Sequence, residues 1–156
     1  MSIMDIYRVA LFGHRDFDAH EELEQKLFPI LKQLIQEKDY VEFYIGRDGE
    51  FDVFTASLIK RFQRNTENTN SEMILVLPYV KKDVEFYEKY YDSVIIPSCM
   101  KGVHPKGAIT KRNRWMIEQC DLLICYVERQ NGGSHDALKY AQKLKKHIIN
   151  LATDFI

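Results

Sequence analysis

The sequence predicts an α/β fold: a single-domain, Rossmann-like three-layer sandwich, with helices on both faces of a mostly parallel sheet of five or six strands. Three observations support this prediction. Short apolar runs typical of buried strands recur along the chain, apolar residues at helical spacing lie between them, and three of the runs end at glycine-bearing turns. Strands that alternate with helices need crossover connections, which give parallel strands. We expect one domain over residues 1–156, a length that can bury its own core.

Six apolar runs are the expected strands. The first is nearly continuous, as in a central strand that is covered on both faces, and the fifth is also strongly apolar. The runs span residues 7–12, 41–45, 73–77, 93–97, 121–127 and 147–151.

The segments between these runs are the expected helices. Asp18 and Glu21 have the spacing of a capping box ahead of the first helix, in which Pro29 should cause a kink or a break. Residues 98–107 hold two glycines and a proline, so we expect a loop there that could act as a lid. The apolar spacing marks helices over residues 23–35, 51–62, 81–91, 109–120 and 137–144.

The three glycine-bearing turns form the candidate ligand site. Each joins a strand to a helix and would expose backbone N–H groups at the helix N-terminus, where anions bind readily. Ligands of such sheets lie beyond the carboxyl ends of the strands, so we expect the turns to meet on one rim and to hold a nucleotide-like ligand. The expected ligand-binding residues are Gly13, His14, Arg15, Gly46, Gly49, Asp52, Arg112, Asn113, Gly132, Gly133 and Ser134.

In the first turn, Gly13 would let the backbone approach a ligand, and His14 and Arg15 could contact a phosphate, a ribose or a base. The alternative is a plain turn with a solvated histidine and arginine. The turn lacks the three spaced glycines of the dinucleotide-binding fingerprint, which argues against ordinary NAD-dependent dehydrogenase chemistry.

The second turn places three carboxylates and two glycines within residues 46–52. Asp48 or Asp52 could accept hydrogen bonds from ribose hydroxyls or from a base edge. The alternative is that Asp52 only stabilises the first turn of a helix. If the protein is an enzyme, Asp48, Glu50 and Asp52 are the candidate catalytic residues.

In the third turn, Ser134 is the expected helix N-cap, and Gly132 and Gly133 can adopt positive φ, so a phosphate would fit there. The alternative is a flexible, capped turn. The basic segment 111–115, at the start of the next-to-last helix, could grip phosphates through Arg112 and stack a base on Trp115. Its alternative is a solvated helix face.

Composition narrows the class of partner and the compartment. The net charge of −1 gives no basic field for coating duplex nucleic acid, although Arg112, Arg114 and Trp115 leave single-stranded nucleic acid as a minor hypothesis. The three cysteines form no CxxC pair and the five histidines lack metal-binding spacing, so we expect reduced cysteines, no metal and no required cofactor. No apolar stretch has the length of a membrane span, so we expect a cytoplasmic protein.

An ordered set of short motifs runs through nearly the whole chain. It comprises Phe12-Gly13-His14-Arg15, Ile45-Gly46 with Gly49-x-Phe51-Asp52, Arg112-Asn113-x-Trp115-Met116 followed by Asp121-Leu122-Leu123-Ile124, and Gly132-Gly133 with Tyr140-Ala141. In this order the motifs resemble the SLOG superfamily (Smf/DprA/LOG-like), and within it most the YpsA-like branch.

The resemblance implies a modified Rossmann fold that binds nucleotides or nucleotide-derived ligands at the strand ends, in bacteria and often as a dimer. Some relatives are sensors or DNA-handling modules, whereas the LOG enzymes cleave the N-glycosidic bond of a nucleoside monophosphate. The enzymes' PGGxGTxxE signature would place His135, Asp136 and Lys139 where they have Gly, Thr and the catalytic Glu. This departure disfavours phosphoribohydrolase activity by that mechanism.

Two hypotheses on function follow. The leading one is a SLOG-type sensor or regulatory protein, a homo-oligomer without membrane contact, that holds a nucleotide or an ADP-ribose-like ligand. The alternative is an enzyme that cleaves N-glycosidic bonds, either a nucleoside monophosphate phosphoribohydrolase or a nucleoside deoxyribosyltransferase-like catalyst. In that case one carboxylate would stabilise an oxocarbenium-like centre, and His14 or His135 would assist the leaving base.

Overall fold

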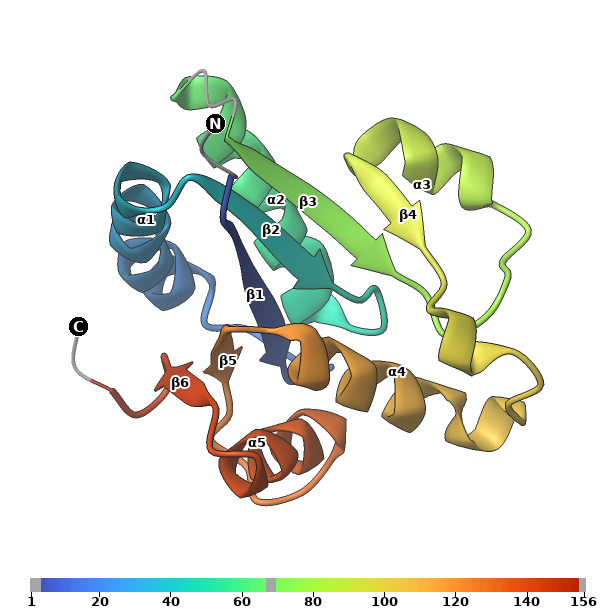
Figure 1. Cartoon of the computed structure of the whole chain (residues 1–156). Coiled ribbons are helices and arrows are strands. Elements are labelled where there is room, and N and C mark those ends of the chain that lie inside the picture. The colour runs from blue at the N-terminus through green and yellow to red at the C-terminus, as the bar shows by residue number, and fades with distance from the viewer. Residues whose placement is uncertain (1–3, 67–69, 155–156) are drawn as a thin grey trace.

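One parallel sheet forms the centre of the molecule. The structure is a computed structural model that describes residues 4–66 and 70–154 (Figure 1). Within these residues six strands pair in the order β4-β3-β2-β1-β5-β6, and every pairing is parallel. The predicted α/β class is therefore confirmed. The strands are β1 (Ile6–Gly13), β2 (Tyr40–Ile45), β3 (Ser71–Val76), β4 (Ser93–Ile95), β5 (Leu122–Tyr126) and β6 (His147–Asn150).

Helices cover both faces of the sheet, which gives the predicted three layers. Along β1, Val9 and Leu11 face one core and Ala10 and Phe12 face the other, because successive side chains of a strand point to opposite faces. The first core is closed by α1 (His20–Glu37), α2 (Glu50–Asn65) and α3 (Val84–Tyr90). The second is closed by α4 (Pro105–Gln119) and α5 (Gly133–Lys143), which lie together in Figure 1.

Helix α1 begins and continues differently from the prediction. Its N-cap is Ala19 and no side chain caps it, so the predicted capping box is wrong. The buried ring of Phe17 anchors the chain ahead of the helix instead, edge-on to Tyr126 at 5.0 Å. The helix also runs undivided through Pro29. Pro29 and Gln25 are both exposed, so water can satisfy the Gln25 carbonyl that loses its intrahelical partner.

The segment predicted as a loop and lid, residues 98–107, is partly helical. A short 3₁₀ helix, η1 (Ser98–Met100), precedes α4, and α4 begins at Pro105, where proline lacks only an N–H that has no intrahelical acceptor. His104 caps this helix, since its Nδ1 accepts a hydrogen bond from the Lys106 amide at 3.1 Å. No residue of this segment lines the cavity at the carboxyl ends of the strands, and the lid stays a prediction.

The chain changes direction in the middle of the sheet. From β1 it moves outward through β2, β3 and β4, and α4 then carries it back across to β5 and β6 on the other side of β1. The carboxyl ends of β1 and β5 therefore flank a topological switch point, where ligands of open α/β sheets bind. In the described ranges, every helix is too short or too polar to cross a bilayer.

Candidate functional site

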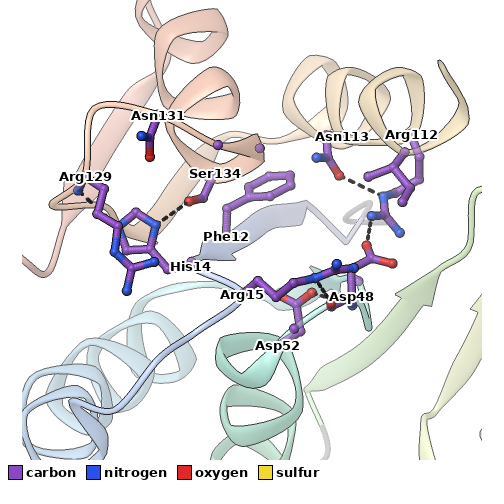
Figure 2. Close-up of a pocket in the computed structure, with 16 residues that line it drawn as sticks. Phe12, His14, Arg15, Asp48, Asp52, Arg112, Asn113, Arg129, Asn131 and Ser134 are labelled. Atoms are coloured by element: carbon purple, nitrogen blue, oxygen red, sulfur yellow. Dashed lines mark hydrogen bonds and ion pairs between the residues drawn. The ribbon is translucent and has the colours of Figure 1, made fainter. Parts of the chain in front are cut away.

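A cavity of about 370 Å³ opens at this switch point (Figure 2). The turns after β1, β2 and β5 and one face of α4 form its walls. All eleven predicted ligand-binding residues line it, together with Asp48, whereas the third carboxylate candidate, Glu50, does not. The complete lining is Phe12, Gly13, His14, Arg15, Gly46, Asp48, Gly49, Asp52, Ile109, Arg112, Asn113, Arg129, Asn131, Gly132, Gly133 and Ser134.

His14 holds the turn after β5 against the end of β1. Its Nε2 accepts hydrogen bonds from the amides of Glu128 and Arg129, at 3.0 and 3.2 Å, and its Nδ1 lies 3.1 Å from Ser134 Oγ. Because Nε2 accepts, the neutral ring carries its proton on Nδ1 and donates it to the serine. Burial, aided by the Arg129 charge, lowers the pKa of His14 and keeps the ring neutral. Both nitrogens are already bonded, contrary to the expectation that His14 contacts a ligand or assists a leaving base.

Three glycines of the site make room for protein rather than for a ligand. A Cβ on Gly13 would lie 2.1 Å from the Phe51 ring, and one on Gly49 would lie 2.5 Å from the Cα of Arg15. A Cβ on Gly46 would press on the Arg112 guanidinium at 3.2 Å. The expectation that Gly13 admits a ligand to the backbone is therefore corrected, because an aromatic ring already occupies that space.

The turn after β5 is the open part of the cavity. Gly132 has a φ of 92°, and a side chain on Gly132 or Gly133 would meet no atom within 4 Å. Gly132 is the N-cap of α5, so the predicted N-cap role of Ser134 is wrong: this serine lies inside the first turn and bonds His14. The first-turn amides of a helix have no intrahelical acceptor, so this end of α5 offers donors and a positive dipole to the cavity.

Arg112 is a buried anchor in the middle of α4. Its side chain is 2% exposed, its Nη1 donates to the Val76 carbonyl at 2.8 Å, and its Nη2 forms an ion pair with Asp48. Its Nε donates to Asn113 Oδ1 at 2.9 Å. A guanidinium buried this deeply needs such a carboxylate, since an unpaired buried charge is costly.

The basic segment 111–115 does not act as one unit. It lies within α4 rather than at its start, and its side chains point apart. Trp115 packs on the Tyr44 ring, with centroids 5.5 Å apart, and Arg114 lies 5.1 Å from the centre of the Tyr140 ring. Neither lines the cavity, so the predicted stacking of a base there on Trp115 is wrong.

Asp52 lies in the first turn of α2, as predicted, and its carboxylate faces the cavity floor (Figure 2). It accepts a hydrogen bond from the Asp48 amide at 3.0 Å. Burial, with the charge of Asp48 adding to it, raises the pKa of Asp52 to about 6. Of the three candidate catalytic carboxylates, Asp48 is ion-paired and Glu50 accepts from the Phe17 amide outside the cavity.

Two exposed arginines complete the positive rim. Arg15 donates through Nε to the Asp48 carbonyl at 2.9 Å, and Arg129 donates through Nη2 to the Asp16 carbonyl at 2.8 Å. Each guanidinium has five N–H donors, so both keep donors for an anion. Arg129 was not among the predicted site residues. Its position in the turn that carries Gly132 was the signal that could have found it. Elsewhere in the described ranges too, His, Cys, Asp and Glu side chains form no group of three that could hold a metal ion.

Comparisons with known proteins relate the chain to others by fold. No protein-family model and no curated protein matches it. It is similar to DNA processing protein A (DprA) from Streptococcus pneumoniae, with a TM-score of 0.66 and 16% identity over 92% of this chain and 49% of that one. DprA from Helicobacter pylori, whose structure describes a single-stranded DNA binding mode, gives a TM-score of 0.62 and 18% identity over 91% and 63%. The chain thus spans about half to three-fifths of these proteins, with which it shares the Rossmann-like fold.

Proposed function

We propose that this protein binds a nucleotide or a nucleotide-derived ligand in the cavity at the β1/β5 switch point. The open N-terminus of α5, at Gly132 and Gly133, is the observation that carries the proposal. An added Cβ at either glycine would meet no atom within 4 Å, so a ligand can approach the backbone closely there. Phosphate groups bind helix N-termini of this kind through backbone amides and the helix dipole.

The remaining walls suit the other parts of such a ligand. Arg15 and Arg129 stand on the rim and would pair with phosphate oxygens. Asp52 and Asn113 offer polar atoms for ribose hydroxyls, and Phe12 and Ile109 give an apolar wall for a base. The volume is near the lower end of the range of about 300–1,000 Å³ for ligand pockets, so the cavity fits one nucleotide unit.

The structural comparisons support the same ligand class. The Helicobacter pylori protein with this fold binds single-stranded DNA, a chain of nucleotide units. A free nucleotide and a nucleotide within a strand present the same phosphate, sugar and base to the cavity. We also propose that the chain is a SLOG-type protein of the YpsA-like branch. Its role would be that of a sensor for the bound nucleotide.

Calorimetric titration and thermal unfolding with AMP, dAMP, ADP-ribose and inorganic phosphate test the proposal. A ligand present at about 100 times its Kd should raise the free energy of unfolding by about 2.7 kcal/mol. Arg129→Gln should weaken binding by about tenfold, since a hydrogen bond to a charged group contributes about 1.5 kcal/mol or more. Arg64→Gln, an exposed arginine in the last turn of α2, is the matched control and should bind as the wild type does. If none of these compounds binds to folded protein, the proposal is wrong.

A further inference from the structure

A larger groove borders the cavity, and we call it the α2–α3 groove. It has a volume of about 950 Å³ and shares the residues Arg15, Asp48 and Gly49 with the cavity. Arg15, held on the Asp48 carbonyl, therefore stands between the two spaces. The groove is also lined by His20, Arg47, Val53, Phe54, Phe86 and Tyr90.

Apolar and aromatic side chains give this groove its character. The Phe86 side chain on α3 is 61% exposed, and Val53 on α2 is 46% exposed. The ring of Phe54 lies 4.3 Å from that of His20, and Tyr90 adds a further ring on α3. Flat rings that remain accessible are surfaces on which a nucleic-acid base can stack, whichever base it is.

The cavity and the α2–α3 groove differ in the charge of the side chains that line them. In the groove, the Arg47 guanidinium donates through Nη1 to the Tyr91 hydroxyl at 3.2 Å and lies 4.9 Å from the centre of the Tyr87 ring. Two acidic residues, Asp16 and Glu50, line the same groove and offset its positive charge. Glu50 accepts from the Phe17 amide. The groove thus suits an uncharged aromatic group, whereas the cavity, with the end of α5 and two arginines, suits phosphate.

We propose that the α2–α3 groove binds the second base of a ligand made of two nucleotide units joined through phosphate. This inference rests on the proposed function. The first nucleotide unit and the phosphates occupy the cavity. The sugar-phosphate backbone of the ligand passes Arg15, and the second base stacks on Phe86. Two such bases occur both in a free dinucleotide and at the end of a single strand.

Titration calorimetry with dAMP and with the 5′-phosphorylated dinucleotide pdApdA tests this proposal. The dinucleotide should bind more tightly than dAMP. Phe86→Ala should weaken pdApdA binding by about 5- to 150-fold, the range expected from the loss of one base stack, and leave dAMP binding unchanged. Tyr79→Ala, an exposed aromatic residue outside both spaces, is the matched control and should change neither affinity. A longer 5′-phosphorylated oligodeoxyadenylate, titrated alongside, separates the strand end from the free dinucleotide.

The outcomes separate this inference from the proposed function. If dAMP and pdApdA both fail to bind, both proposals are wrong. If dAMP binds but pdApdA binds no more tightly, or Phe86→Ala leaves its affinity unchanged, only the second-base proposal is wrong. A Phe86→Ala protein that changes its mass in light scattering while both affinities stay the same would show instead that the groove contacts another protein copy.

Discussion

The contact between Gly13 and Phe51 gives the sharpest prediction on stability. In Gly13→Ala the new methyl carbon would lie 2.1 to 2.6 Å from three atoms of the Phe51 ring, where ordinary contacts begin at 3.4 Å. The ring must withdraw by more than an ångström. It is fully buried and packs edge-on against Phe17 at 5.4 Å, so it has little space into which to move.

Overpacking of this kind costs about 1–3 kcal/mol of the free energy of unfolding. For a chain of this length each kcal/mol corresponds to about 2–4 °C in Tm, so the expected loss is about 2–12 °C. Urea unfolding and calorimetry of the ligand-free protein measure both quantities, and no ligand enters the comparison.

Gly133→Ala is the matched control, because it makes the same chemical change at the other end of the site. Its Cβ would meet no atom within 4 Å, and its φ is not positive. It should leave the free energy of unfolding unchanged or raise it by about 0.4–1 kcal/mol, since alanine restricts the unfolded chain more than glycine does. A Gly13→Ala protein as stable as the wild type would refute the packing argument.

Two further predictions concern pH. His14→Leu should lose about 1–3 kcal/mol at about pH 7.5, because two amides lose their acceptor. The lowered pKa of His14 makes the wild type lose stability as the pH falls through and below about 6.5, so urea titrations at about pH 5 should show a smaller deficit; an equal deficit would contradict a neutral His14. Asp52 has the opposite sign, because its raised pKa favours the folded state at low pH and that contribution is lost as the pH rises through about 6. Asp52→Asn should therefore gain about 1–3 kcal/mol relative to the wild type between about pH 5 and pH 8, and parallel curves for the two proteins would refute the shift.

The sheet and the meeting of the three turns at one cavity were predictable from the sequence for one physical reason. Strands that alternate with helices must be parallel, and parallel strands end on the same edge, so turns that follow strands meet there whatever their distance along the chain. Gly13, Gly46 and Gly132 are far apart in sequence and line one cavity for this reason.

The tasks of individual side chains were not predictable, because they depend on contacts between distant segments. His14 bonds Ser134 across 120 positions, and Arg112 pairs with Asp48 across 64. In the sequence, a histidine or an arginine that bonds a distant segment looks the same as one that faces solvent. Two helix starts were predicted too late, because α4 begins at Pro105 and α5 at Gly133, ahead of the first residues that the apolar spacing marks.

The burial of Arg112 has a consequence for how the protein would respond to salt. Asp48 cancels its charge inside the protein, so the side-chain charges of the cavity that attract an anion are those of Arg15 and Arg129, which are exposed to solvent. At physiological ionic strength, ions in solution screen the interactions of exposed charges over a distance of about 8–10 Å. Buried pairs are screened much less. Added salt should therefore weaken the binding of a phosphorylated ligand and leave intact the buried Arg112–Asp48 pair, which helps to shape the cavity.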